Sequence, residues 1–165
     1  MNDSNDIRVL LVDDEETMLE FLSKRLLRDG FTVKAAFSGE EAVQAAAAKA
    51  YDVSVVDVNM AGMDGIETLG MLKDIRPEMQ CIVLTGLHTP EDFLPEGEKN
   101  ACSLLFKPVD FESLAQTIRE VHNQGLKRRD EKKEQEKKPV HSARNRSKFK
   151  ETFIKLKKLY GVENG

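Results

Sequence analysis

Val9-Leu10-Leu11-Val12-Asp13-Asp14, an apolar run that ends in two acids, begins a pattern that recurs along the chain. If such runs are parallel strands, the polar groups that follow them meet at one edge of one sheet, where open α/β sheets bind ligands. The pattern therefore predicts a site at that edge. The other runs are Phe31 to Ala36, which ends without a charge, Val53-Ser54-Val55-Val56 before Asp57, Ile82-Val83-Leu84 before Thr85, and Ser103-Leu104-Leu105-Phe106 before Lys107-Pro108.

Helix-like segments separate these runs from Ile7 to about Gln124. Ser38 and Asp110 are typical N-cap residues, Gly30 is a typical helix stop, and a helix from Asp64-Gly65 ends at Pro77. Two faces are spaced for burial: Met18, Phe21, Leu22, Arg25 and Leu26 in the first helix, and Phe111, Leu114, Ala115, Ile118 and Val121 in the last.

Continuous apolar strands are typical of a sheet that helices cover on both faces. Right-handed crossovers then predict an α/β fold with a doubly wound five-stranded parallel sheet in the flavodoxin-like order 2-1-3-4-5. In that order strands 1 and 3 are neighbours, so Asp13, Asp14 and Asp57 are expected side by side. Thr89 to Asn100 fits less well, because Pro95 and Gly97 interrupt it and an interior proline costs about 3 kcal/mol. A short or distorted helix is expected there.

The charges divide the chain into an acidic body and a basic extension. Residues 1–124 carry 11 Lys and Arg against 23 Asp and Glu, a net charge of −12, whereas residues 125–165 carry 14 against 6, a net charge of +8. We predict a domain over 6–124, a charged linker or helical extension over 125–146, and a basic amphipathic helix over 147–160. This last segment packs on its own domain or a dimer mate, binds a partner protein, or contacts nucleic acid or a membrane surface.

Composition excludes several classes. No apolar run reaches membrane-spanning length, and the polar start Met1 to Asp6 is unlike a signal peptide, which favours a cytoplasmic protein without a membrane span. The two cysteines, Cys81 and Cys102, lack metal-binding spacing and are expected to be core thiols in a reducing compartment.

The predicted cluster has the chemistry of phosphoryl transfer. Three adjacent carboxylates, Asp13, Asp14 and Asp57, repel one another unless a cation is present, and Mg²⁺ takes carboxylate and phosphate oxygens. Lys107 supplies a positive charge and Thr85 a hydroxyl donor, which suits a reaction that depends on positioning and charge neutralisation. An aspartate can itself be the nucleophile and form an aspartyl-phosphate.

Over about residues 6 to 124 the chain resembles the receiver domain of two-component response regulators. The resemblance rests on Val12-Asp13-Asp14-Glu15, Val56-Asp57-Val58-Asn59-Met60, Met63-Asp64-Gly65, Leu84-Thr85-Gly86 and Phe106-Lys107-Pro108, in this order and at these spacings.

The resemblance implies a role for each site residue. Asp57 would accept a phosphoryl group from a phosphohistidine of a sensor kinase. Asp14 and Asp57 would bind Mg²⁺ directly, Asp13 largely through water, and the Asn59 carbonyl would be a further ligand. Lys107 would contact the phosphoryl group and Thr85 would move toward it. A trans Lys107-Pro108 bond is the default, although the sequence allows cis.

Two departures from the family concern signal output. Leu104 stands where the family often has a Tyr or Phe that rotates on switching, so altered coupling is expected. Asn100-Ala101 replaces the usual Gly-Ala, a change that Asn tolerates in a left-handed turn.

We therefore expect a phosphorylation switch that catalyses only its own phosphorylation and dephosphorylation, with a sensor histidine kinase or phosphotransfer protein upstream, a downstream protein partner and a possible homodimer. Two alternatives remain. An Asp-nucleophile phosphatase would need a second acid where Asn59 stands, and a nucleic-acid-binding protein would use the basic extension.

Overall fold

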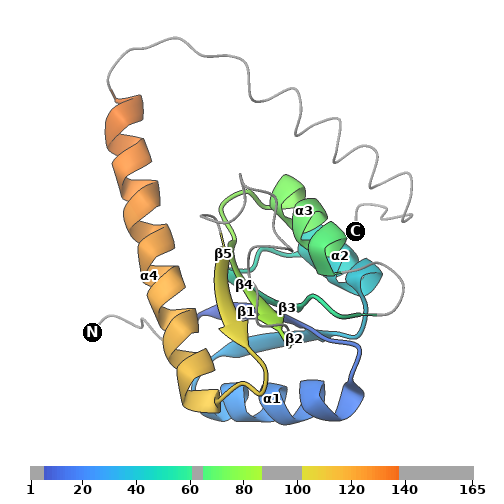
Figure 1. Ribbon diagram of the computed structural model, residues 1–165. Coiled ribbons are helices and arrows are strands. Elements are labelled where there is room, and N and C mark those ends of the chain that lie inside the picture. Colours follow the sequence, from blue (N-terminus) through green and yellow to red (C-terminus); the bar gives the residue numbers. More distant parts are fainter. Residues whose placement is uncertain (1–5, 61–64, 87–101, 138–165) are drawn as a thin grey trace.

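The computed structural model describes residues 6–60, 65–86 and 102–137. Its centre is a five-stranded parallel sheet in the order β2-β1-β3-β4-β5 (Figure 1). The predicted strand order is confirmed. The strands are β1 (Arg8–Val12), β2 (Thr32–Ala36), β3 (Val53–Asp57), β4 (Gln80–Thr85) and β5 (Cys102–Phe106).

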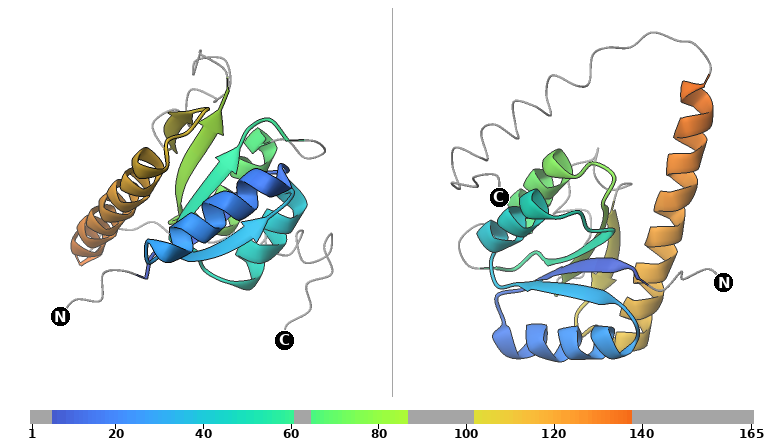
Figure 2. Two further views of the ribbon diagram at one scale, coloured as in Figure 1. Left: turned by 90° about the horizontal axis from the view of Figure 1, so that it is seen from below. Right: turned by 180° about the vertical axis from the view of Figure 1, so that it is seen from behind.

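Helices cover both faces of the sheet, as Figures 1 and 2 show. On one face lie α1 (Glu16–Arg28) and α4 (Phe111–Glu136), and on the other α2 (Gly39–Ala48) and α3 (Gly65–Ile75). Alternate strand residues serve the two layers: Leu10 and Val12 pack with α2 and α3, whereas Val9 and Leu11 pack with α1 and α4. This double burial explains why the inner strands β1, β3 and β4 are apolar at most positions.

Two predicted N-caps are present. The Ser38 hydroxyl accepts a hydrogen bond of 3.1 Å from the Glu41 amide at the start of α2. The Asp110 carboxylate accepts one of 3.0 Å from the Ser113 amide at the start of α4. Gly30, just beyond α1, has a positive φ of 91°, a conformation that glycine adopts without steric cost.

The predicted buried face of α1 was partly wrong. Its buried side chains are Leu19, Leu22 and Leu26, while Phe21 is 53% exposed. Leu19, Leu22 and Leu26, which are spaced three and four residues apart, form the stripe of α1 that faces the sheet. Leu19 is therefore buried where the sequence predicts Phe21. Phe21 lies beside this stripe, with the Arg25 guanidinium 5.9 Å from its ring centre.

Helix α4 continues well beyond Gln124 and projects past the sheet (Figure 1). Its extension touches the start of β4, where Arg128 donates a hydrogen bond of 3.3 Å to the Gln80 side chain and Arg129 lies 3.7 Å from the Glu78 carboxylate. The expected irregular helix at 89–100 and the candidate helix at 147–160 lie outside the described residues. No helix within the described ranges is long and apolar enough to cross a membrane.

At the edge of the sheet where the strands begin, Arg8 binds Asp52 through three hydrogen bonds. The Asp52 carboxylate accepts from the Arg8 amide at 2.9 Å and from Nε and Nη2 at 3.0 Å each. Burial opposes the charge of Asp52, but these hydrogen bonds and the charge of Arg8 outweigh it and lower the pKa of Asp52.

We expect Asp52→Asn to lower the free energy of unfolding by about 1–3 kcal/mol at pH 7, because hydrogen bonds to a charged group are lost from a buried position. The lowered pKa means that this stabilisation is present above the ordinary pKa of an aspartate and disappears as the pH falls through the folded-state value. Urea unfolding should therefore separate the variant from the wild type at pH 7 and bring them together in acid. Equal stabilities at pH 7 would contradict the assignment.

Candidate functional site

The predicted polar residues meet at one edge of the sheet. Asp13 directly follows β1, Asp57 is the last residue of β3, Thr85 is the last residue of β4, and Lys107 directly follows β5. The parallel register aligns these strand ends, because Val12 pairs with Val56 and Thr85 with Phe106. Asp14 lies beside Asp13 at the same edge.

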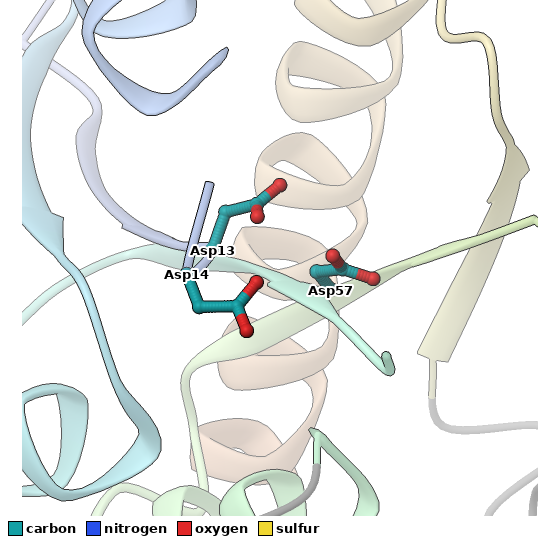
Figure 3. A group of neighbouring side chains, drawn as sticks. All are labelled: Asp13, Asp14 and Asp57. Carbon is teal, nitrogen blue, oxygen red and sulfur yellow. The ribbon is translucent and has the colours of Figure 1, made fainter. Parts of the chain in front are cut away.

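Three carboxylates are grouped at this edge (Figure 3). One oxygen from each of Asp13, Asp14 and Asp57 lies within 4.8 Å of the others. Asp13 and Asp57 are buried, at 2% exposure each, whereas Asp14 is exposed. The group is thus open to solvent on the Asp14 side and enclosed on the protein side.

Lys107 binds the two buried carboxylates. Its Nζ donates a hydrogen bond of 2.8 Å to Oδ2 of Asp57 and lies 3.5 Å from Oδ2 of Asp13. The backbone at this position is held as well, because the Lys107 amide donates to the Thr85 carbonyl at 2.7 Å. The Lys107–Pro108 peptide bond is cis, the less common form of an X-Pro bond.

Backbone amides orient the other carboxylate oxygens. The Asn59 amide donates to Oδ1 of Asp57 at 3.0 Å, and the Glu15 amide donates to Oδ1 of Asp13 at 2.9 Å. Each buried aspartate therefore accepts a hydrogen bond from a backbone amide with one carboxylate oxygen and directs the other oxygen toward Lys107. The sequence did not reveal these two amide contacts, since they depend on how the chain turns after each strand.

Gly65 supports the backbone of Asp57 by its lack of a side chain. A Cβ atom at this position would stand 2.3 Å from the Asp57 carbonyl oxygen and 2.4 Å from Cα of Val58. The first turn of α3 can approach the end of β3 this closely only with glycine. The sequence shows Gly65 as part of a motif, but this steric role is visible only in the structure.

The charges of the site are unevenly balanced. The pKa of Asp13 is raised, mainly by burial and also by the negative charge of Asp57. The hydrogen bond from the Glu15 amide and the positive charge of Lys107 lower this pKa, but they do not cancel the rise. Burial acts against the charge of Lys107, but its hydrogen bond to Asp57 and the charges of both acids raise its pKa overall. Lys107 is consequently protonated at neutral pH, and the cluster retains an excess of negative charge.

We expect Asp13→Asn to stabilise the protein by about 1 kcal/mol at pH 7 in the presence of EDTA, because it removes one buried like charge. A raised folded-state pKa means that the penalty is absent below the ordinary pKa of an aspartate and grows as the pH rises through the folded-state value. The stability gap measured by urea unfolding should therefore close toward acid pH. A variant less stable than the wild type at pH 7 would contradict this account.

A cavity of about 360 Å³ adjoins the site on the α1 side. Asp13, Glu15, Lys107 and Pro108 provide its polar end, and Met18, Leu22, Leu84 and Val109 provide an apolar wall. The cluster can therefore be approached from the surface between α1 and the residues that follow β5.

Comparison with known proteins assigns the fold to a family. Residues 9–119 match the model of the response regulator receiver domain. The chain belongs to this family. It is a receiver domain of two-component response regulators, a phosphoryl-accepting switch whose members typically bind Mg²⁺ at an acidic cluster.

Among curated proteins, the receiver is 33% identical over 112 residues to the transcriptional regulatory protein ZraR of Salmonella typhimurium, a match that covers 68% of this chain and 25% of ZraR. The chain thus spans about a quarter of the length of this relative. It is 32% identical to GlrR of Escherichia coli, over 75% of this chain and 28% of GlrR.

Solved structures agree with the fold. A CheY-like receiver domain from Methanospirillum hungatei is 25% identical with a TM-score of 0.69, covering 74% of this chain and 98% of that one. The response regulator TrrA of Thermotoga maritima, solved in complex with Mg²⁺ and BeF, is 28% identical with a TM-score of 0.62, covering 69% of this chain and 97% of that one.

Proposed function

We propose that Asp57 is the phosphoacceptor of this receiver. The observation that carries the proposal is the 2.8 Å contact between its Oδ2 and Lys107 Nζ at an edge of the sheet where two further carboxylates gather. Asp57 is the last residue of the central strand β3, which lies between β1 and β4. Its carboxylate is therefore adjacent to Asp13 on one side and to Thr85 on the other.

The reaction is the transfer of a phosphoryl group between two nucleophiles. A carboxylate oxygen of Asp57 attacks the phosphorus of a phosphohistidine, the P–N bond breaks, and its electron pair remains on the imidazole nitrogen. The product is an aspartyl-phosphate. Hydrolysis by water later returns the carboxylate and releases inorganic phosphate.

The donor set suits Mg²⁺. Hard oxygen ligands from Asp14 and Asp57, with Asp13 acting through water and the Asn59 carbonyl as a further ligand, match the preference of this ion for few carboxylates and several waters. The exposure of Asp14 leaves the site open to solvent. When bound, the ion neutralises charge on the carboxylates and on the incoming phosphoryl group.

Lys107 and Thr85 then serve the phosphorylated state. Lys107 already pairs with the oxygen that would carry the phosphoryl group, so its ammonium can follow that group and contact one of its oxygens. Thr85 is 1% exposed at the end of β4, one strand from Asp57, where its hydroxyl can turn toward a phosphoryl oxygen.

Output is proposed to leave through β4, β5 and α4. Leu104 in β5 is partly buried against the core on the α2 and α3 side, in register with Val83 two residues before Thr85. A leucine there repacks without the ring rotation of an aromatic residue, so we propose a smaller rearrangement on switching.

The partners are proposed from the receiver's class. A sensor histidine kinase or phosphotransfer protein donates the phosphoryl group, and a downstream protein reads the switched surface. We propose residues 6–124 as the receiver, 125–146 as a charged extension and 147–160 as a basic amphipathic helix. The related ZraR and GlrR are transcriptional regulators, so control of transcription is one output that the extension can serve.

The test uses the whole chain with Mg²⁺ and acetyl phosphate. We expect intact mass spectrometry to detect one added phosphoryl group, peptide mapping to place it on Asp57, and EDTA to prevent it. Beryllofluoride with Mg²⁺ should shift the amide resonances at the strand ends. Absence of both responses, with acetyl phosphate and with a phosphorylated histidine donor, would overturn the proposal.

A further inference from the structure

The two cysteines of the chain lie side by side, although 20 residues separate them in the sequence. Cys81 in β4 is the direct register partner of Cys102 in β5. Both pack against the core layer formed with α2 and α3, so their side chains point to the same face of the sheet. Neighbouring strands are about 4.8 Å apart, within the range of Cα separations that a disulfide can span.

The two thiols also interact with each other. The neighbouring Cys102 thiol and burial together raise the pKa of Cys81 well above its ordinary value. The Cys81 sulfur also lies 3.4 Å from the Ser54 hydroxyl, which holds the side chain in place beside β5. Both cysteines are reduced in the structure.

The two thiols differ in their access to solvent. Cys81 is 2% exposed, whereas Cys102 is only partly buried. A small oxidant can therefore reach Cys102 while Cys81 remains shielded.

We propose that Cys81 and Cys102 form a redox-active dithiol that peroxide converts to a disulfide between β4 and β5. Hydrogen peroxide oxidises the Cys102 thiol to a sulfenic acid, and one water is released. The Cys81 sulfur then attacks the Cys102 sulfur, the S–O bond breaks, and the Cys81 proton leaves with the hydroxide as a second water. Two thiols and one peroxide give one disulfide and two waters.

The bond is expected to be readily reversible. Joining two Cβ atoms across adjacent parallel strands draws them closer than the usual strand spacing, and strained disulfides are the more easily reduced ones. The bond also closes residues 81–102 into a covalent ring, which restricts the unfolded chain. The oxidised protein should therefore melt at a higher temperature than the reduced protein while remaining a substrate for dithiothreitol.

The pair lies at the opposite end of β4 and β5 from Thr85 and Lys107. The cysteines are therefore separated from the residues proposed to bind the phosphoryl group, and oxidation of the pair does not depend on phosphorylation of Asp57. Labelling of Asp57 by acetyl phosphate can succeed or fail without deciding whether the disulfide forms.

The test treats the folded full-length chain with hydrogen peroxide and counts the thiols that iodoacetamide can alkylate. We expect both thiols to disappear, a peptide joining Cys81 to Cys102 to appear in the digest, and dithiothreitol to restore both. Since the chain has only two cysteines, an intramolecular disulfide has one possible pairing. In Cys81→Ser, which lacks the resolving thiol, dimedone should instead trap the sulfenic acid on Cys102.

Cys81→Ala is a second variant in case serine disturbs the core. Three results would overturn the proposal: a wild type that keeps both thiols while Cys81→Ser is trapped by dimedone, a disulfide that forms only after urea has unfolded the chain, or oxidation of Cys102 to a sulfinic acid with no disulfide. Circular dichroism recorded before and after oxidation identifies the state in which the bond formed.

Discussion

Asp57→Asn is expected to abolish phosphorylation of the chain by acetyl phosphate and Mg²⁺. The amide is nearly the same size as the carboxylate, and its single oxygen can replace one of the two acceptors that bind the Asn59 amide at 3.0 Å and Lys107 at 2.8 Å in the wild type. The amide has no anionic oxygen with which to attack phosphorus, so phosphorylation is lost because the nucleophile is missing. Intact mass spectrometry over a time course measures it.

The matched control for this change is Asp74→Asn, which makes the same substitution at an exposed position of α3. It should be labelled at the wild-type rate. Circular dichroism and urea unfolding should show that Asp57→Asn remains folded, since removing one of three grouped acids relieves repulsion. Labelling of Asp57→Asn at the wild-type rate and stoichiometry would mean that another residue is the acceptor.

Gly65→Ala is expected to have the largest effect on stability. The added Cβ would stand 2.3 Å from the Asp57 carbonyl oxygen, and the neighbours are backbone atoms that cannot move aside without shifting the end of β3. Overpacking of this kind costs about 1–3 kcal/mol or more. Because the displaced residue is Asp57 itself, we also expect slower labelling by acetyl phosphate at a temperature where the variant is folded.

Gly70→Ala provides a control within the same helix. A Cβ at Gly70 has open space around it, and replacing a helical glycine by alanine stabilises by roughly 0.5–1 kcal/mol. The two substitutions should thus shift the urea midpoint in opposite directions, and Gly70→Ala should leave labelling unchanged. A Gly65→Ala protein as stable as the wild type would show that α3 does not need its close approach to β3.

Much of the fold could be predicted because the sequence signals were local. Apolar runs with a charged or polar residue at the end identified four of the five strands, and Ser38 and Asp110 identified two helix starts. The rotation of α1 was predicted less well. Phe21 and Leu19 are both apolar and close in sequence, and only the packing of α1 against the sheet determines which of them is buried.

The residues of the site could be predicted, but their geometry could not. Asp13, Asp57, Thr85 and Lys107 each follow or close a strand, and a parallel sheet brings such positions together. The amide contacts of Asn59 and Glu15 depend on backbone direction after the strand, which residue types do not specify. The same limit applies to Gly65, which matters because it lies so close to the Asp57 backbone that no side chain fits between them.

By itself the sequence determined the alternation of strands and helices, which acidic and basic residues stand at the ends of the strands, and the division of charge into an acidic body and a basic extension. Hydrophobic periodicity and charge are properties of neighbouring residues, so they can be read without a structure. The tertiary structure alone decided that Lys107 pairs with Asp57, that Gly65 touches the Asp57 backbone, and that Cys81 lies beside Cys102. Each of these depends on the register of strands that are distant in the chain, and register is determined by packing across the whole sheet.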